Sequence, residues 1–555
     1  MQQFLREHHR PAFYCTWIVL SLLQASFTEL QDDEAYYWVF SQYLDWGYFD
    51  HPPMIALVIK TGTTFFTNEL AVRLVPLMLN ALTLYIIERI IDNKNPFLFY
   101  AICFSMAVLQ VAGFMAVPDI PLMFFTALFF LVYKHYLQKG SWMNVLLLGL
   151  VAACLLYSKY HGVLILFFVL ISNFSLLKDR RVYIAGFLAL FFFSFHLWWQ
   201  YQHGWISFKY HLFESNVKEY QFRYTTEFIL GQFLLAGPIA GFILIPATLL
   251  YKTKNVLERS LKFTAIGIFA FFFLSSFRGE VEANWTSPVL IPIIILSHLF
   301  LGQRTSWRRW IYRLLPVTIA IVLLFRIAMV FDIIPHPAVS NRFHAWKDWP
   351  GQMQKLAPSS LYVFNNSYQR ASKFWFYTGK MTYSLNHYAQ RRNNYNFWPV
   401  EDSVFGKPVY LLDVYNLPAF TDSIQIPGWT LGYRYDSSFH SFAKVFITPT
   451  QTNYVMQEND SLEIEITAFL PLHYQQYLDA HKEIDQLVII GVFRERDLVK
   501  NIDTKLTIQQ LKNKPDQVIR LATGLPKGEY ILRFAIGSDS GLFTHNSEKI
   551  KLKIN

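Results

Sequence analysis

Apolar runs of about 20 residues recur through the first 335 residues of this 555-residue chain, and they limit its possible folds more than any other feature. A run of that length can cross a bilayer as one helix. Charged residues make up only 16% of the chain, against about 25% in a typical soluble domain, and hydrophobic residues make up 53%. This composition excludes a disordered chain, a collagen-like repeat and a disulfide scaffold. The sequence therefore predicts a membrane protein with a soluble part attached.

We expect about eleven membrane spans, judged from apolar length and from the charges that separate the runs. They cover residues 11–27, 71–91, 96–115, 120–137, 143–158, 161–177, 182–201, 228–251, 263–277, 285–301 and 314–331. The first run, preceded by basic residues, also fits a cleaved signal peptide. We favour an uncleaved first helix because the run is long and many spans follow it.

Lysine and arginine in the loops set the orientation, since they collect on the cytoplasmic side. With the N-terminus inside, the inside segments hold Arg6, Arg10, Arg89, Lys94, Lys134, Lys139, Lys178, Arg180, Arg181, Lys252, Lys254, Arg259, Lys262, Arg304, Arg308, Arg309 and Arg313. The outside loops hold Lys60, Lys159, Lys209, Lys218, Arg223 and Arg278. This asymmetry accounts for much of the net charge of +10 without a nucleic-acid partner.

The predicted fold is thus a polytopic α-helical membrane domain over residues 1–335, followed by an exported part. Residues 336–452 are expected to form an α/β segment, with a helix in SYQRASKFWFY and a strand at 409–414. Residues 453–555 are expected to form a β-sandwich-like segment, because SLEIEITA alternates apolar and polar residues and further β-rich runs cover 487–493 and 530–536.

The first outside loop, QDDEAYYWVFSQYLDWGYFDHPP, opens with three successive acids. A helix starting there would lie in the membrane interface, with an apolar face opposite Glu34, Ser41 and Asp45. Asp32 or Asp33 could simply cap that helix. Three acids beside apolar surface favour a functional role at the depth of a lipid headgroup.

The same loop ends in Asp50, His51 and two prolines. An acid beside an imidazole could bind a divalent ion or a phosphate oxygen, or the pair could belong to an ordinary solvated turn. We regard Asp50 and His51 as an incomplete metal site, so a divalent cofactor is possible and no other cofactor is expected.

The remaining outside loops add acids, cations and aromatics. Asp119 in VPDIPL could cap its helix or face the same cavity as Asp33. Lys159 in SKYHG could bind a lipid phosphate or reach the interface as a snorkelling lysine. The loop WWQYQHGWISFKYHLF suits an interface belt or a sugar platform, and FRGEVEANWTSP contributes Arg278, Asn284 and Trp285.

The spans themselves carry few charges, whereas an ion-coupled transporter would place ionisable groups at mid-membrane. Charges gathered at the outer interface suit an enzyme that uses a lipid-linked donor. Two alternatives remain: a transporter or flippase for lipid-linked sugars, and a membrane-anchored binding protein whose working part is the exported segment. The exported segment could recognise an acceptor or stabilise the membrane domain as a cap.

These loops resemble bacterial membrane glycosyltransferases of the GT-C type, in the branch that holds protein-mannosyltransferase-like enzymes and lipid A aminoarabinose transferases. The resemblance rests on DDEAYYW, WGYFDHPPM, ELAVRL, VPDIPL, SKYHG, HGWISF and EANWTSP, which span residues 32 to 288. The strings YQRASKFWFYTG and RRNNYNFWP look like the exported domain of this family. In aminoarabinose transferases a lysine stands where this chain has His51, which puts phosphate binding by His51 in doubt.

The resemblance implies a multi-pass protein of the bacterial cytoplasmic (inner) membrane, with its C-terminal part periplasmic or extracellular. It implies transfer of a sugar, with inversion, from a polyprenyl-phosphate donor to an acceptor hydroxyl or phosphate on a glycolipid, polysaccharide or protein. Asp33, Glu34 and Asp119 would be catalytic, with Asp33 as the general base. The donor phosphate and sugar would contact His51, Lys159, Tyr160, Arg278, Asn284 and Trp285.

Overall fold

The computed structural model describes residues 7–215, 219–334, 336, 343–344, 346–359, 361–426, 429–458 and 460–555. Arg6 and Lys218, two of the charges used for the orientation, lie outside these residues. The chain divides into two compact units, Met1–His344 and Ala345–Asn555. The predicted segment boundaries at 335 and 452 stay predictions.

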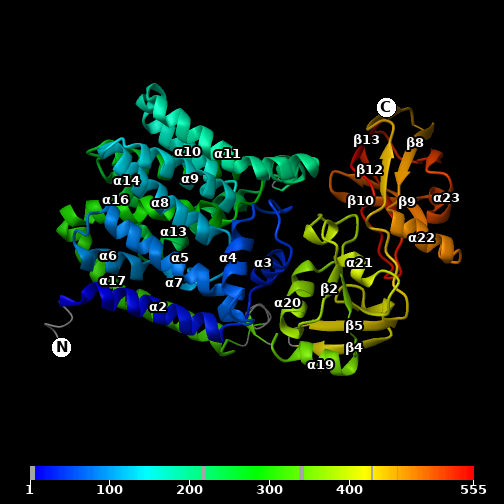
Figure 1. Cartoon of the computed structure of the whole chain (residues 1–555), viewed down its shortest axis with the longest axis horizontal. Helices are drawn as coiled ribbons and strands as arrows, with labels where there is room; N and C mark the ends of the chain where they lie inside the picture. The colour runs from blue at the N-terminus through cyan, green and yellow to red at the C-terminus, as the bar shows by residue number, and fades with distance from the viewer. Residues whose placement is uncertain are drawn as a thin grey trace. The chain divides into compact units, whose positions relative to one another are not determined.

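The first unit is helical (Figure 1). Its helices are α2 (His9–Phe27), α3 (Asp32–Gln42), α4 (Met54–Thr63), α5 (Glu69–Ile90), α6 (Pro96–Ser105), α7 (Ala107–Val111), α8 (Asp119–Gln138), α9 (Trp142–Ser158), α10 (Gly162–Ser172), η1 (Phe174–Lys178), α11 (Arg180–Gln202), α12 (Ile206–Lys209), η2 (Tyr210–Glu214), α13 (Phe222–Ala236), α14 (Gly241–Leu250), α15 (Val256–Ser275), η3 (Ala283–Val289), α16 (Leu290–Gln303) and α17 (Thr305–Val330). One apolar core joins most of them.

The count of eleven spans is not confirmed. Within the described residues, five helical segments are long and apolar enough to cross a membrane: α5, α8, α11, η3 with α16, and α17. Two bent pairs, α2 with α3 (87°) and α13 with α14 (95°), raise the number to at most seven. Of the others, α4, α6, α9 and α10 are apolar but have only 10–17 residues.

Two predicted spans are broken by local backbone features. The run at 96–115 is interrupted at Met106, whose extended backbone separates α6 from α7. The run at 228–251 bends after α13 at Gly237, which has φ +123°. A Cβ on Gly237 would lie 2.5 Å from the carbonyl oxygen of Ser105, so only glycine fits this bend.

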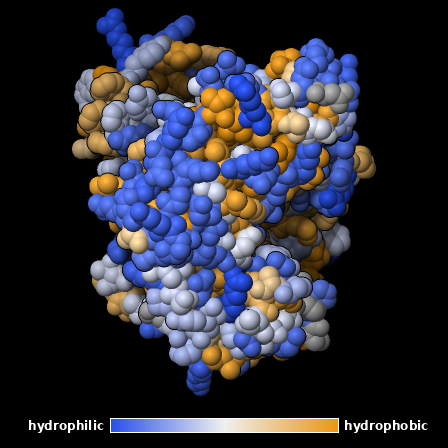
Figure 2. Space-filling view, turned by 90° about the vertical axis from the view of Figure 1, so that its right-hand side faces the viewer, coloured by the Kyte–Doolittle hydropathy of each residue, from blue (hydrophilic) through white to orange (hydrophobic). Residues whose placement is uncertain are grey.

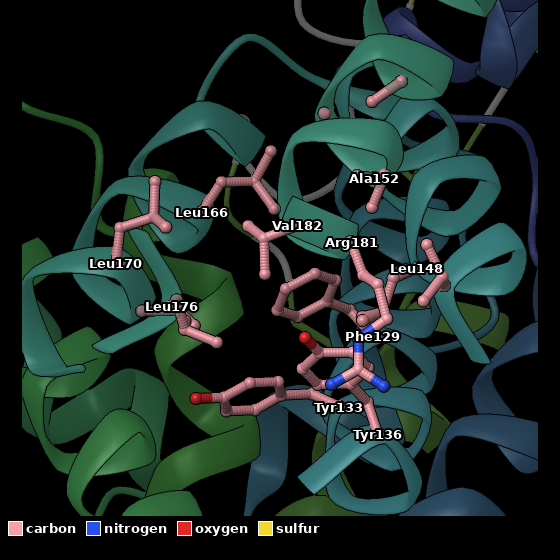
Figure 3. Close-up of a pocket in the computed structure, with 15 residues that line it drawn as sticks. Phe129, Tyr133, Tyr136, Leu148, Ala152, Leu166, Leu170, Leu176, Arg181 and Val182 are labelled. Carbon is pink, nitrogen blue, oxygen red and sulfur yellow. The ribbon is translucent and has the colours of Figure 1, made fainter. Parts of the chain in front are cut away.

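An apolar cavity of about 150 Å³ lies between α8, α9, α10 and α11 (Figure 3). Leu148, Leu166 and Val182 line it, and Arg181 lies beside the ring of Tyr136 at 5.7 Å. None of the predicted site residues lines this cavity. The predicted site residues of the first unit thus lie outside this cavity.

The second unit contains helices α19 (Trp349–Leu356), α20 (Tyr368–Thr378), α21 (Val400–Val404), α22 (Leu472–Ala480) and α23 (Ile508–Asn513), with two short turns, η4 (Asn394–Asn396) and η5 (Leu417–Ala419). Its strands are β1 (Tyr362–Asn365), β2 (Thr382–Leu385), β3 (Val409–Asp413), β4 (Asp422–Ile426), β5 (Trp429–Asp436), β6 (Phe446–Pro449), β7 (Asn453–Met456), β8 (Ser461–Phe469), β9 (Leu487–Arg494), β10 (Asp497–Thr507), β11 (Asp516–Ala522), β12 (Gly528–Ile536) and β13 (Ile550–Ile554).

These strands form three sheets. The first has the order β2-β1-β3-β5-β4, with β2, β1 and β3 parallel and α20 following β1. The other two, β10-β9-β12-β13-β7 and β11-β8-β6, share one apolar core. The predicted strands at 409–414, 461–468, 487–493 and 530–536 are confirmed, and β8 alternates exposed and buried residues along its whole length.

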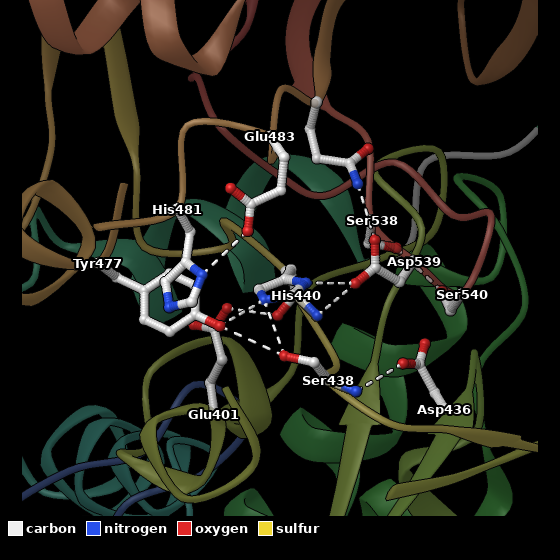
Figure 4. A network of polar contacts seen from close by, with 12 residues as sticks. Glu401, Asp436, Ser438, His440, Tyr477, His481, Glu483, Ser538, Asp539 and Ser540 are labelled. Atoms are coloured by element: carbon white, nitrogen blue, oxygen red, sulfur yellow. Dashed lines mark hydrogen bonds and ion pairs between the residues drawn. The ribbon is translucent and has the colours of Figure 1, made fainter. Parts of the chain in front are cut away.

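A polar network joins the first sheet to the sandwich (Figure 4). His440 follows β5, and its Nδ1 lies 2.6 Å from Oδ2 of Asp539, while its Nε2 lies 2.9 Å from the hydroxyl of Tyr477 on α22. Gln486 donates to the other oxygen of Asp539.

Figure 2 shows one face of the molecule, on which hydrophilic residues predominate and hydrophobic residues lie in small groups.

Candidate active site

The first outer loop begins with the helix predicted at the three acids, since α3 starts at Asp32. Neither aspartate is the N-cap. Gln31 occupies that position, and Glu34 closes a capping box by accepting from the backbone N–H of Gln31 at 2.9 Å. The idea that Asp32 or Asp33 caps the helix is therefore wrong.

Glu34 is buried, although it was predicted on the polar face of α3 together with Ser41, which is buried as well. The reason is Arg73 on α5, an arginine with no exposed surface that binds both carboxylate oxygens of Glu34. Oε1 of Glu34 also accepts from the backbone N–H of Ala116 at 2.9 Å. The Glu34 carboxylate is thus fully occupied and cannot contact a substrate, which argues against its predicted catalytic role.

Arg73 uses all five of its N–H groups. Besides its bonds to Glu34, it donates to the carbonyl oxygens of Ala25 (3.1 Å), Thr28 (2.6 Å) and Glu29 (2.8 Å). These carbonyls lie at the 87° bend between α2 and α3. The guanidinium therefore fixes the end of α2, the start of α3 and, through Glu34, the segment that leads to α8.

Asp33, by contrast, is exposed on the first turn of α3. Its neighbour Glu34 holds the backbone of Ala116, three residues before Asp119. The first two outer loops are therefore joined directly at the acids. A common cavity for Asp33 and Asp119 remains a prediction.

Asp119 is the first residue of α8, and it anchors the centre of the candidate site. Its carboxylate accepts from Nζ of Lys159 at 2.9 and 3.1 Å, from Oγ of Ser287 at 2.6 Å and from Nδ2 of Asn284 at 3.2 Å. Lys159 and Asp119 are only 6% and 7% exposed. The structure thus brings together three predicted residues from loops 40 and 165 positions apart in sequence.

Three histidines lie near this ion pair. His51 and His161 each have a buried Nδ1 without a hydrogen-bond partner among the described residues. The ring of His51 lies 6.4 Å from that of His211, and Nε2 of His211 donates to the carbonyl oxygen of Asp50 at 2.8 Å. Burial, and after it the charge of Lys159, lowers the pKa of His51 to about 3 and that of His161 well below its ordinary value.

His51 should therefore make stability pH-dependent. The unfolded histidine binds a proton below its ordinary pKa of about 6.5, whereas the folded one does not until about pH 3. The stability that neutral His51 contributes is present above pH 6.5 and lost as the pH falls toward 3. We expect the melting temperature in detergent to fall by a few degrees from pH 7.5 to 5. His51→Gln should reduce that fall, and an equal fall in this variant would contradict the assignment.

The fourth outer loop holds the first one in place. Trp199 donates to Asp45 at 2.8 Å, His196 Nδ1 lies 2.8 Å from the carbonyl oxygen of Trp46, and Ser207 donates to the carbonyl oxygen of Tyr48 at 2.9 Å. A Cβ on Gly47 would lie 2.5 Å from the Trp199 ring. Ser207 of HGWISF thus contacts Tyr48 of WGYFDHPP, and His196 and Trp199 on α11 hold the residues at the start of that motif.

The other predicted residues differ in their relation to this centre. Tyr160 lies 5.3 Å from the ring of His211 and contacts His196, and Trp285 lies 5.7 Å from the ring of His161. Arg278 is exposed and, in the described part of the chain, makes no hydrogen bond or ion pair with another predicted residue.

Asp50 accepts from the hydroxyl of Tyr36 at 2.7 Å. Among the described residues, no group of three His, Cys, Asp or Glu side chains could hold a metal ion. Asp50 and His51 alone do not form a metal site.

Sequence reasoning missed Arg73, His161, His211 and Ser287. Arg73 had a signal, because a charged residue inside an apolar run is costly and usually has a fixed partner. ELAVRL was recognised as a motif, but the arginine within it was not chosen. Ser287 lies in EANWTSP, another recognised motif, and was likewise not chosen, whereas His211 lies in the fourth outer loop without a comparable signal.

Comparison with known proteins gives matches to the kind of enzyme that the loop motifs resemble. A family model described as dolichyl-phosphate-mannose-protein mannosyltransferase matches residues 50–199. The chain is 25% identical over 340 residues to the lipid A galacturonosyltransferase RgtD of Rhizobium johnstonii, covering 58% of this chain and 70% of that protein.

Two solved structures share the fold. ArnT from Cupriavidus metallidurans in the apo state matches with a TM-score of 0.57 and 12% identity, covering 77% of this chain and 98% of that one. The same protein bound to undecaprenyl phosphate matches with a TM-score of 0.56 and 13% identity, covering 76% and 97%. The family model, the relative and the shared fold together bear out the resemblance to GT-C type glycosyltransferases that the loop motifs predicted.

Proposed function

We propose that this chain transfers a sugar from a polyprenyl-phosphate donor to a glycolipid acceptor at the outer face of the bacterial cytoplasmic membrane. The matched relative is named as a lipid A galacturonosyltransferase, and a matched structure holds undecaprenyl phosphate. These names support a lipid-linked donor and a glycolipid such as lipid A as acceptor. They do not favour the transporter alternative. The orientation, with the second unit outside, follows from the lysine and arginine asymmetry.

The observation that carries this proposal is the buried Lys159–Asp119 pair beside the neutral imidazoles of His51 and His161. Two of the three N–H groups of Lys159 bind Asp119, which leaves one for a ligand. Asp119, held by Ser287 and Asn284, fixes the direction of the lysine. A cation in such a dry setting stabilises an oxyanion far better than one in water.

The reaction follows from these positions. The acceptor oxygen attacks the anomeric carbon of the donor while the bond from that carbon to the phosphate oxygen breaks. Polyprenyl phosphate leaves with the bonding electrons, and Lys159 stabilises the charge that develops on it. Asp33, exposed at the start of α3, takes the proton of the acceptor hydroxyl. Attack opposite the leaving group inverts the configuration of the sugar carbon.

In this mechanism Asp119 positions Lys159 and does not itself contact substrate. His51 and His161 are neutral and could accept hydrogen bonds from sugar hydroxyls through their unpartnered Nδ1 atoms. Tyr160, beside His211, and Trp285, beside His161, would bound the sugar. Arg278 would meet the phosphate only from the exposed side of the site.

A reconstituted assay tests the proposed function. Purified protein in lipid vesicles would receive a radiolabelled polyprenyl-phosphate sugar and lipid A in the outer leaflet. We expect labelled lipid A and an equal amount of released polyprenyl phosphate. Lipid-linked sugar that crosses the bilayer without being consumed would contradict the proposal and favour a flippase.

Replacing Lys159 tests the role of the phosphate contact. Lys159→Gln with Asp119→Asn removes both charges, so no buried carboxylate is left unpaired. We expect kcat/KM for the donor to fall about 100-fold, which corresponds to the loss of one charged contact to the leaving phosphate. Transfer kinetics at varied donor concentration measure it. Lys60→Gln, which changes an exposed lysine on α4, is the matched control and should keep the parental rate. An unchanged kcat/KM in the double variant would exclude Lys159 from donor recognition.

A further inference from the structure

The parallel part of the first sheet in the second unit ends in a group of residues to which no role has been given. Strands β1, β2 and β3 run parallel, so their carboxyl ends meet at one edge. Ligands of open α/β sheets bind outside such an edge. Here the edge is followed directly by α20, an 11-residue helix whose first turn holds Tyr368 and Arg370.

Arg370 is the central feature of this edge. Its guanidinium lies 4.9 Å from the ring centre of Trp429 and 5.7 Å from that of Tyr415. Its Nη1 donates to Oγ of Ser367 and to the hydroxyl of Tyr415, both at 3.1 Å. The two rings and the two hydroxyls hold the guanidinium in a fixed position.

No described acidic side chain forms an ion pair with Arg370, and its Nε and Nη2 donate to no described acceptor. Arg370 is half-buried, and Tyr415 beside it is 65% exposed, so the site is open to solvent. An oriented guanidinium with a free pair of N–H groups matches the geometry of a carboxylate or phosphate.

The neighbouring acid does not neutralise this site. Asp413, at the end of β3, is only 3% exposed. Its Oδ2 accepts from Asn365, and its Oδ1 accepts from the backbone N–H groups of Tyr415 and Asn416. Three donors within the fold thus bind this carboxylate, and among the described residues it forms no ion pair with Arg370.

A second, independent observation concerns Asn365, the last residue of β1. It is 1% exposed, and its Oδ1 has no hydrogen-bond partner among the described residues. A buried acceptor left without a donor lowers the stability of the fold. A hydroxyl reaching this end of the strand would remove that cost, so the edge offers an acceptor for a hydroxyl as well as a cation for an anion.

We propose that the carboxyl edge of β2, β1 and β3, with Arg370 as its anchor, binds a saccharide that carries a carboxylate or phosphate group. Arg370 binds the anionic group through Nε and Nη2, the exposed ring of Tyr415 packs against the sugar, and Asn365 accepts from a hydroxyl. The inference concerns binding alone and stands whether or not the first unit transfers a sugar.

Saturation-transfer NMR on the full chain in lipid nanodiscs tests this binding with a matched series: glucose, glucuronate, glucose 1-phosphate and inorganic phosphate. We expect transfer to glucuronate or glucose 1-phosphate at millimolar concentration and at least 5-fold less to glucose. The stronger of the two anionic sugars identifies the group that is recognised. Inorganic phosphate should compete at least 5-fold more weakly than the bound sugar.

Arg370→Gln should reduce the signal of the anionic sugars at least 5-fold, and Arg520→Gln, which changes an exposed arginine on β11, should leave it unchanged. Tyr415→Leu changes a side chain that is 65% exposed, and it should reduce the signal about 2-fold even if Arg370→Gln fails to fold. Equal binding of glucose, equal competition by inorganic phosphate, or an unchanged signal in the Arg370 and Tyr415 variants would each overturn the proposal.

Discussion

Asp33→Asn is expected to lower the rate of sugar transfer about 1,000-fold while leaving the melting temperature unchanged. The change keeps the size of the side chain and removes its ability to take a proton, and general bases contribute about 10² to 10⁴ in rate. Asp33 is exposed on the first turn of α3, where the loss of one charge costs little stability compared with the loss of a buried one. Single-turnover transfer of a labelled sugar from polyprenyl phosphate measures the effect.

Donor binding provides the control for this variant. Because Asp33 acts on the acceptor hydroxyl, the affinity for the polyprenyl-phosphate sugar should stay within about 2-fold of the parental value. Full transfer activity in Asp33→Asn would show that another group accepts the proton. A large loss of donor affinity would instead place Asp33 at the donor.

Glu34→Gln, the same chemical change one residue further on, is expected to have a different result. It leaves the guanidinium of Arg73 buried without a countercharge, and breaking a buried ion pair costs about 3–5 kcal/mol. We expect the melting temperature in detergent to fall by at least about 5 °C. Thermal unfolding followed by tryptophan fluorescence measures it, with Asp33→Asn as the matched control.

Arg73→Lys should destabilise the protein as well, because an ammonium group has three donors where the guanidinium uses five. The bend between α2 and α3 would lose its bonds to Ala25, Thr28 or Glu29. If Glu34→Gln abolished transfer without lowering the melting temperature, Glu34 would belong to the chemistry and the positioning role assigned to it would be wrong.

The adjacent acids Asp33 and Glu34 show which features of the site could be predicted from the sequence and which could not. The motif DDEAYYW predicted an acidic helix start, and α3 begins at Asp32 as expected. Helical periodicity placed Glu34 on the polar face. A single buried arginine from α5 reversed that placement, because it gives the buried carboxylate the partner charge and hydrogen bonds that burial requires.

The predicted count of eleven spans was likewise not confirmed by the tertiary structure. Apolar length predicts which segments can enter a membrane, but it does not report where the backbone bends. Gly237 and Met106 interrupt two of the predicted runs for local reasons, a close approach to Ser105 and an extended residue. In the second unit the alternating apolar and polar residues of β8 were sufficient to predict the strand from the sequence, because one face of this strand is buried against a shared core.

By itself, the sequence determined the class of the protein: apolar runs long enough for a bilayer, a β-rich C-terminal part, and loop motifs that resemble GT-C glycosyltransferases. Those properties depend on composition and on short-range order along the chain. Only the tertiary structure decided which charges meet. Lys159 pairs with Asp119 across 40 residues, Asn284 reaches the same carboxylate across 165, and Arg73 takes Glu34 out of solvent. The physical reason is that a buried charge must find its partner in space, and no local pattern records where that partner lies.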